Sequence, residues 1–97
     1  MKPVVWLDES LADLRVIGEY IAWDDPDAAY RVGRRIKAAA DTLADHPEMG
    51  SPGRVEATRE LVLSDLPYIL SYQITPEAIR ILAVIDTACK WPERFET

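Results

Sequence analysis

The run Ile79-Arg80-Ile81-Leu82-Ala83-Val84-Ile85 decides the fold class, because all but one of its residues are apolar. A continuous apolar run of strand length is typical of a strand that is covered on both faces. We therefore expect an interior strand over 78–86. Counting alternate residues predicts that Arg80 and Asp86 lie on the same side of this strand, with Leu82 and Val84 between them.

Two more strands are predicted just before this one, over 58–63 and 68–74. The turn residues of 64–67 and 75–77 separate the three segments as in successive hairpins. Alternate residues of the 68–74 segment are large and apolar. One face of the sheet is therefore expected to pack on helices, and the opposite face is expected to be partly open.

The first half of the chain predicts a short strand followed by two helices. Residues 3–7 are rich in β-branched and aromatic side chains, as in a first strand. Asp8 or Ser10 is the predicted N-cap of the first helix, and Asp25 before Pro26 is a start signal for the second. Their apolar positions recur at helical spacing, in two stripes: Leu11, Leu14, Ile17, Gly18, Ile21, and Ala29, Val32, Ile36, Ala39, Ala40, Leu43. The short connection between the helices predicts an antiparallel hairpin.

The predicted order is β-α-α-β-β-β, an α+β fold with the helical hairpin packed on one face of a small, mainly antiparallel sheet. A chain of 97 residues is expected to form one domain, 1–97.

Charge and cysteine content limit the classes of function. The net charge is −6 and the pI about 4.6, whereas a free-standing nucleic-acid binder is usually basic. Cys89 is the only cysteine, which excludes an internal disulfide and suits a reducing cytosol. The apolar run 4–7 is too short for a signal peptide or a membrane span, so we expect a cytoplasmic protein without a membrane partner.

The side chains that could carry chemistry are cations in the second half of the chain. His46 is the only histidine and has no carboxylates at ligand spacing, so neither a metal site nor a cofactor is predicted. The sequence also lacks a glycine-rich phosphate loop. The candidate cations are Arg54, Arg59, Arg80, Lys90 and Arg94. On an open sheet face they could bind phosphate; alternatively they are solvated or paired with nearby glutamates. Trp91 is either a core residue or an anchor for a partner.

Several segments in order resemble toxins of the ParE/RelE superfamily, which belong to bacterial type II toxin–antitoxin systems. These segments cover almost the whole chain: 11–22, 25–29, His46-Pro47, Gly50, Gly53-Arg54, Thr58-Arg59-Glu60-Leu61, 68–72, 79–82 and Trp91-Pro92. Each motif alone is weakly specific, and the resemblance rests on their common order and spacing. The closer resemblance is to ParE-like members.

This resemblance implies a toxin that is neutralised by a cognate ParD-like antitoxin in a heteromer, with two copies of each chain or more. ParE-like members are associated with poisoning of DNA gyrase, and operator DNA is contacted only through the antitoxin. On this interpretation Arg59, Arg80, Lys90, Trp91 and Arg94 are the predicted partner-binding residues. The chain would then be a binder rather than an enzyme.

Two alternatives stay open. RelE-like members are ribosome-dependent ribonucleases that cut mRNA, and here Arg54, Arg59 and Arg80 would be the catalytic candidates. Related chains often carry His and then Arg just before the Trp-Pro pair, where this chain has Asp86 and Cys89. An aspartate there would repel RNA phosphate. The third hypothesis follows from that difference: a toxin-derived module that has lost toxicity and acts as co-repressor with its antitoxin.

Overall fold

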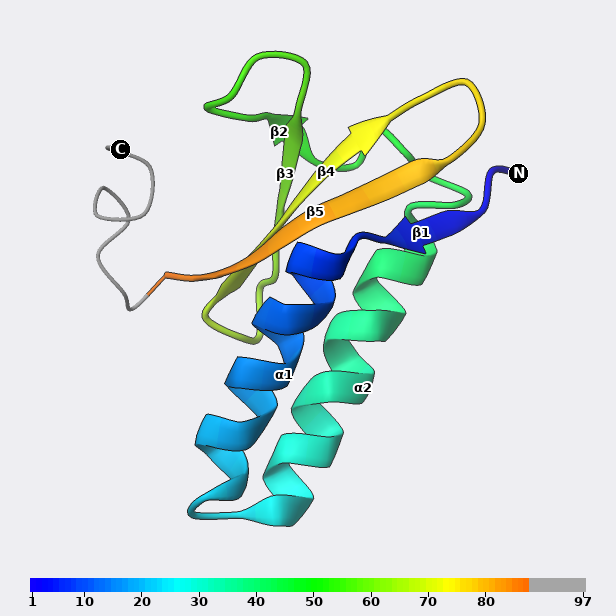
Figure 1. Ribbon diagram of the computed structural model, residues 1–97. Helices are drawn as coiled ribbons and strands as arrows, with labels where there is room; N and C mark the ends of the chain where they lie inside the picture. The colour runs from blue at the N-terminus through cyan, green and yellow to red at the C-terminus, as the bar shows by residue number, and fades with distance from the viewer. Residues whose placement is uncertain (88–97) are drawn as a thin grey trace.

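The computed structural model describes residues 1–87 as two helices packed against a five-stranded sheet (Figure 1). The elements follow in the order β1 (Val4–Trp6), α1 (Asp8–Ala22), α2 (Pro26–Thr42), β2 (Ser51–Pro52), β3 (Arg59–Val62), β4 (Tyr68–Ile74) and β5 (Ile79–Asp86). The predicted α+β class and element order are confirmed. The two-residue strand β2 was not predicted, because it lies in a segment that is rich in proline and glycine.

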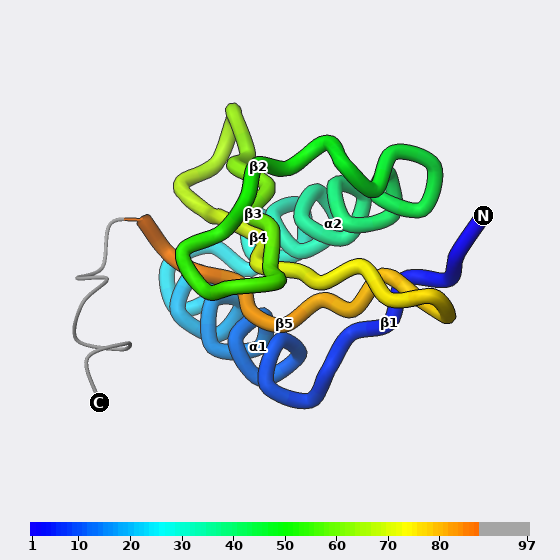
Figure 2. The backbone as a smooth tube through the Cα atoms, turned by 90° about the horizontal axis from the view of Figure 1, so that it is seen from above, coloured from blue at the N-terminus to red at the C-terminus, as the bar shows by residue number. Residues whose placement is uncertain are grey.

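The strands are ordered β1-β5-β4-β3-β2 across the sheet. β1 pairs with β5 in parallel, and the other neighbours are antiparallel. β5 is therefore an interior strand, as its apolar run predicts. Figure 2, seen from above, shows β4 and β5 running side by side across the helical hairpin.

A β-bulge in β5 overturns the predicted face of Arg80. Ser71 lies opposite Ala83 and Tyr72 lies opposite Ile81, so Leu82 has no partner on β4. One extra residue reverses the alternation of side chains beyond it. Arg80 is thus on the face of Gln73, away from the helices, whereas Asp86 and Val84 are on the helix-facing side. The prediction that Arg80 and Asp86 share a face was wrong, because period-2 counting assumes a regular strand.

The two helices form the predicted antiparallel hairpin, in which α1 and α2 lie side by side (Figure 1). Asp25 caps α2 as predicted, because its Oδ1 accepts the amide of Ala28 at 3.1 Å and Pro26 is the first helical residue. The predicted cap of α1 was wrong. Leu7 holds the N-cap position, and the buried Ser10 donates its hydroxyl to the Leu7 carbonyl at 2.7 Å.

The core lies between α2 and the helix-facing side of the sheet. It combines two sets of buried side chains, Ile36, Ala39, Ala40 and Leu43 from α2 and its cap, and Leu61, Leu70, Tyr72, Ile79, Ile81 and Val84 from the strands. Trp6 is partly buried and packs against this core. Within residues 1–87, neither helix has the length and apolar character needed to cross a membrane.

Helix α1 covers the edge of β5 where β1 ends. Among residues 1–87, no strand neighbours that edge beyond Trp6, and Asp13 accepts the backbone amide of Val84 at 3.0 Å. An edge amide that would otherwise need water or another strand is therefore satisfied by a helix side chain.

Asp13→Ala should lower the free energy of unfolding by about 1–2 kcal/mol, because it removes the acceptor of a partly buried amide. Asp13→Asn keeps an acceptor oxygen and should lose less. Urea unfolding monitored by tryptophan fluorescence measures both values. Equal stability of Asp13→Ala and the parent chain would contradict this role.

Candidate functional site

Arg59 holds the loop between α2 and β2 in place. Its Nε donates to the Gly50 carbonyl at 3.1 Å, and its Nη2 bonds the carbonyls of Glu48 at 3.2 Å and Gly50 at 2.5 Å. Tyr72 fastens the same loop from the buried side: its hydroxyl donates to the Pro47 carbonyl at 2.6 Å and accepts the Gly50 amide at 2.9 Å. The guanidinium of Arg59 therefore has three hydrogen bonds within its own chain, which suit a structural residue.

Arg59→Gln should destabilise the fold by about 1–3 kcal/mol, because carbonyls of the loop lose a charged donor. Arg59→Lys should recover only part of this loss, since an ammonium cannot reproduce the fork of a guanidinium. Thermal unfolding followed by circular dichroism measures both variants. If unfolding were unchanged while activity disappeared, Arg59 would act on a partner instead.

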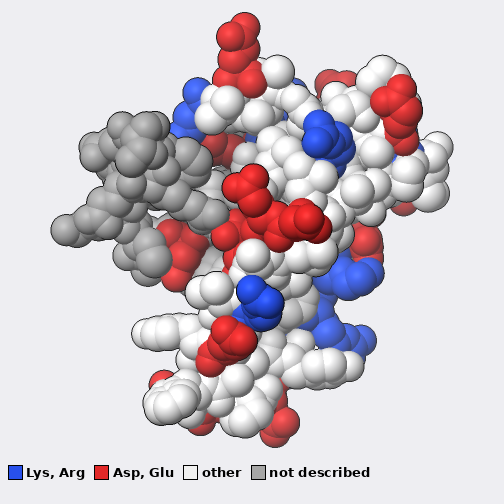
Figure 3. Space-filling model, viewed as in Figure 1, with Lys and Arg blue, Asp and Glu red and all other residues white. Residues whose placement is uncertain are grey.

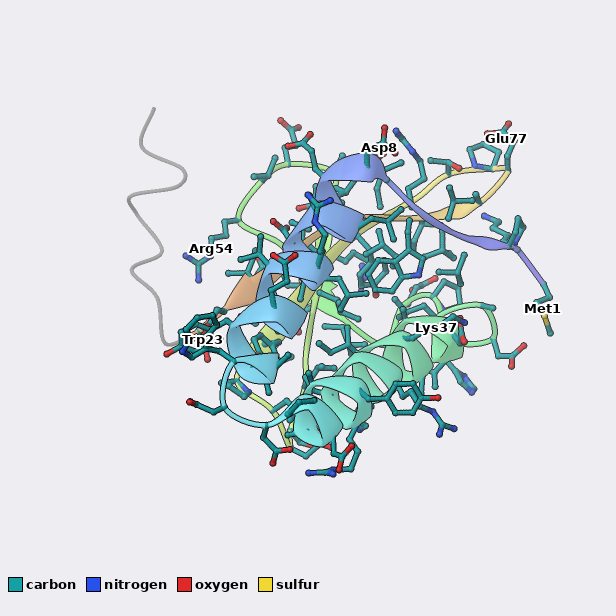
Figure 4. The ribbon with its side chains drawn as sticks, turned by 60° about the horizontal axis from the view of Figure 1, so that its bottom comes forward. Met1, Asp8, Trp23, Lys37, Arg54 and Glu77 are labelled. Atoms are coloured by element: carbon teal, nitrogen blue, oxygen red, sulfur yellow. The ribbon has the colours of Figure 1, made fainter. Side chains whose placement is uncertain are left out.

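The structure does not bring the three candidate arginines to one site. Arg59 pairs with Tyr72 across β3 and β4, on the helix-facing side, whereas Arg80 is on the opposite face and donates to Gln73 Oε1 at 2.9 Å. The exposed Arg54 lies by Glu60, whose Oε2 accepts the Arg54 amide at 3.1 Å and is 3.7 Å from Arg54 Nε. Figure 4 shows Arg54 at the rim of the molecule. The three arginines therefore do not form a cluster on one open sheet face, which was one of the two interpretations that the sequence left open.

The other predicted partner-binding residues, Lys90, Trp91 and Arg94, lie outside the described residues, as does Cys89. Partner binding by Arg59, Arg80 and these three residues stays a prediction. His46 is exposed and follows the end of α2. Together with Pro47, Glu48 and Met49 it lines a shallow hollow. No cluster of three or more His, Cys, Asp or Glu within 1–87 could hold a metal ion.

An exposed apolar stripe runs along α1. Val16, Tyr20 and Trp23 are 60%, 80% and 90% exposed, and their spacing of four and three residues places them on one side of the helix. Figure 4 shows Trp23 at the edge of the molecule, on the side of α1 away from α2. Large aromatic side chains in contact with water are the residue types that most often anchor a protein partner. We call these three residues the α1 stripe.

Comparison with known proteins identifies the family and agrees with the fold. Residues 4–91 match the family described as the ParE toxin of the type II toxin–antitoxin system parDE. The chain belongs to the ParE toxin family.

Two relatives of this ParE toxin have closely similar length. A candidate toxin of Sinorhizobium fredii, Y4kP, is 48% identical over 92 residues, which cover 95% of each chain. Toxin RelE2 of Caulobacter vibrioides is 39% identical over 88 residues, covering 91% of this chain and 98% of RelE2. A solved chain from the chromosomal ParDE system of P. aeruginosa has a TM-score of 0.80 at 24% identity, covering 89% of this chain and 96% of that one. This last likeness shows a shared fold.

The α1 stripe was missed from the sequence, although a signal for it was present. The apolar positions that predict α1, at Leu11, Leu14, Ile17, Gly18 and Ile21, describe one side of the helix alone. Val16, Tyr20 and Trp23 form a second apolar series about a third of a turn away from Leu14, Ile17 and Ile21. A helix that is apolar on two sides indicates a second contact surface.

Proposed function

We propose that this ParE toxin is a non-enzymatic inhibitor of DNA gyrase that a cognate ParD-like antitoxin neutralises. The observation that supports a binder over a ribonuclease is the position of the three arginines. Arg59 is bonded to loop carbonyls, Arg80 is on the other sheet face, and Arg54 lies beside a glutamate. A ribonuclease has to stabilise the charged phosphorane that forms during RNA cleavage, and this requires several donors that converge on one point.

We place the antitoxin on the α1 stripe. An amphipathic helix with apolar residues at the same four- and three-residue spacing would cover Val16, Tyr20 and Trp23. Glu9 and Glu19 lie beside the stripe and are exposed. Their charge favours a partner helix with Lys or Arg at its margins.

Expression of the chain without its antitoxin should arrest growth, and purified protein should inhibit supercoiling by gyrase. Co-expression of the neighbouring reading frame should restore growth if that frame encodes the antitoxin. The same gene with a frameshift near the start codon controls for the effect of expression itself. Normal growth together with unaffected gyrase would overturn the gyrase proposal.

The relative named RelE2 favours a second candidate function for this chain, that of a ribosome-dependent ribonuclease. Toeprinting on translating ribosomes separates the two candidates, since only a ribonuclease would produce codon-dependent cuts. Harmless expression combined with operator binding by the toxin–antitoxin pair would favour the co-repressor instead.

A further inference from the structure

The outer face of α2 carries an unusual concentration of positive charge. Between Asp27 and Asp41 the chain has four cations and no carboxylate, in a protein whose net charge is −6. The cations are Arg31, Arg34, Arg35 and Lys37. Figure 3 shows blue side chains at the right-hand edge of the molecule, alongside α2, and red side chains over the front face.

Two of these four cations form ion pairs within the chain, and two do not. Arg35 Nε is 2.7 Å from Asp65 Oδ2, and Lys37 Nζ is 3.2 Å from Asp41 Oδ2. Within residues 1–87, no such pair is formed by Arg31 or Arg34. These two are three residues apart, so they are neighbours on one side of the helix, where like charges repel. Carboxylates from another molecule would relieve this repulsion.

The ring of Tyr30 restricts the side chain of Arg34 before any partner binds. The guanidinium carbon of Arg34 lies 5.6 Å from the centre of the exposed Tyr30 ring. A cation–π contact of this kind restricts the side chain while leaving its N–H groups available, so less conformational entropy is lost when a carboxylate binds. A guanidinium group also donates two parallel hydrogen bonds to one carboxylate.

We propose that Tyr30, Arg31 and Arg34 form a docking surface for an acidic segment of the antitoxin. This inference rests on the proposed antitoxin and adds a second contact to it. The α1 stripe would take the apolar part of the antitoxin, and the outer face of α2 would take its carboxylates. In Figure 4, Trp23 and Lys37 lie on opposite sides of the hairpin, so the antitoxin would have to pass around it.

The size of the surface favours a short acidic peptide over nucleic acid. From Arg31 to Lys37 the helix rises about 9 Å, enough for two or three carboxylates of an extended chain. Asp27 and Asp41 lie at the two ends of this stretch and would repel the continuing backbone of a polyanion.

The test compares two variants with the same change in net charge. Arg31→Gln/Arg34→Gln removes two positive charges, and Arg15→Glu, at an exposed position on α1, also lowers the charge by two. Glutamine is a good helix former, so α2 should be preserved, and circular dichroism verifies this. Isothermal titration calorimetry then measures binding of the protein encoded by the neighbouring frame. A hexaglutamate peptide and an oligothymidylate serve as defined probes.

Arg31→Gln/Arg34→Gln should weaken antitoxin binding by about 10- to 30-fold and abolish binding of hexaglutamate. Arg15→Glu should change antitoxin affinity by less than about 3-fold. The difference between the variants should shrink between about 50 and 200 mM salt, because exposed charges are screened.

Equal affinity of the parent chain and the double variant would overturn the α2 surface and leave the proposed antitoxin in place. Equal weakening by both variants would also overturn it, since the effect would then be general charge repulsion. Preferential binding of the oligothymidylate through Arg31 and Arg34 would identify a nucleic-acid surface and refute the acidic segment. If the parent chain itself failed to bind the antitoxin, the proposed function would fall as well.

Discussion

Gly50→Ala should destabilise this ParE toxin by about 3 kcal/mol, because the space for a Cβ is already filled. A Cβ at Gly50 would lie 2.7 Å from the carbonyl oxygen of Glu60 and 2.8 Å from both the ring edge and the hydroxyl of Tyr72. The Glu60 carbonyl belongs to β3 and cannot move freely. Tyr72 is fully buried and bonded to Pro47 and Gly50, so the ring cannot move aside either.

The matched control is Gly33→Ala in α2, where a Cβ would meet nothing within 4 Å. This change should stabilise the protein by about 0.5–1 kcal/mol, as alanine is the better helix former. Urea unfolding measures both variants against the parent. The backbone of Gly50 does not have a positive φ, so strain of that kind does not complicate the comparison. If Gly50→Ala were as stable as the parent, the loop could not be packed as closely against Tyr72 as described.

Tyr20→Ala/Trp23→Ala should weaken antitoxin binding by about 100-fold with little effect on folding. Both side chains are largely exposed in the toxin alone, so truncation removes almost no buried apolar surface from the folded chain. In the proposed complex they are the main anchors of the α1 stripe and would become buried. Calorimetric titration with the antitoxin gives the affinity, and thermal unfolding of the toxin alone gives the stability.

Val62→Ala is the control for this experiment. Val62 is also exposed, but it lies on β3, on the sheet face away from the helices. Its truncation should leave antitoxin affinity within about 3-fold of the parent. Equal losses in the control and in the double variant would show that the α1 stripe is not the antitoxin surface. A loss of toxin stability in the double variant would contradict the exposure of Tyr20 and Trp23.

Local patterns predicted the larger elements of the fold. Asp25-Pro26 starts α2 because a carboxylate acceptor and a residue without an amide suit the first turn of any helix. The continuous apolar run of 79–85 identified β5 as an interior strand, because only a strand covered on both faces needs such a composition. These features depend on neighbours within a few positions along the chain.

The candidate site was predicted less well, for a physical reason. The sequence alone does not decide whether Arg54, Arg59 and Arg80 bind phosphate or form bonds within their own chain. The choice depends on atoms seven to eleven positions away in the sequence, beyond the reach of helix or strand periodicity: the Gln73 amide for Arg80 and the carbonyls of 48 and 50 for Arg59. The bulge at Leu82 is another example, since it is defined only by the pairing of β5 with β4.

The sequence by itself determined the family, the order of the main elements and the helical hairpin, because periodicity, caps and turn residues act locally. Only the tertiary structure decided which side chains are bonded within the chain and which are exposed to a partner. It assigns Arg59 to the loop before β2, separates Arg80 from Asp86, and leaves Val16, Tyr20 and Trp23 in water. Burial and hydrogen bonding are properties of packed surfaces, and in this protein those surfaces are built from segments distant in the chain.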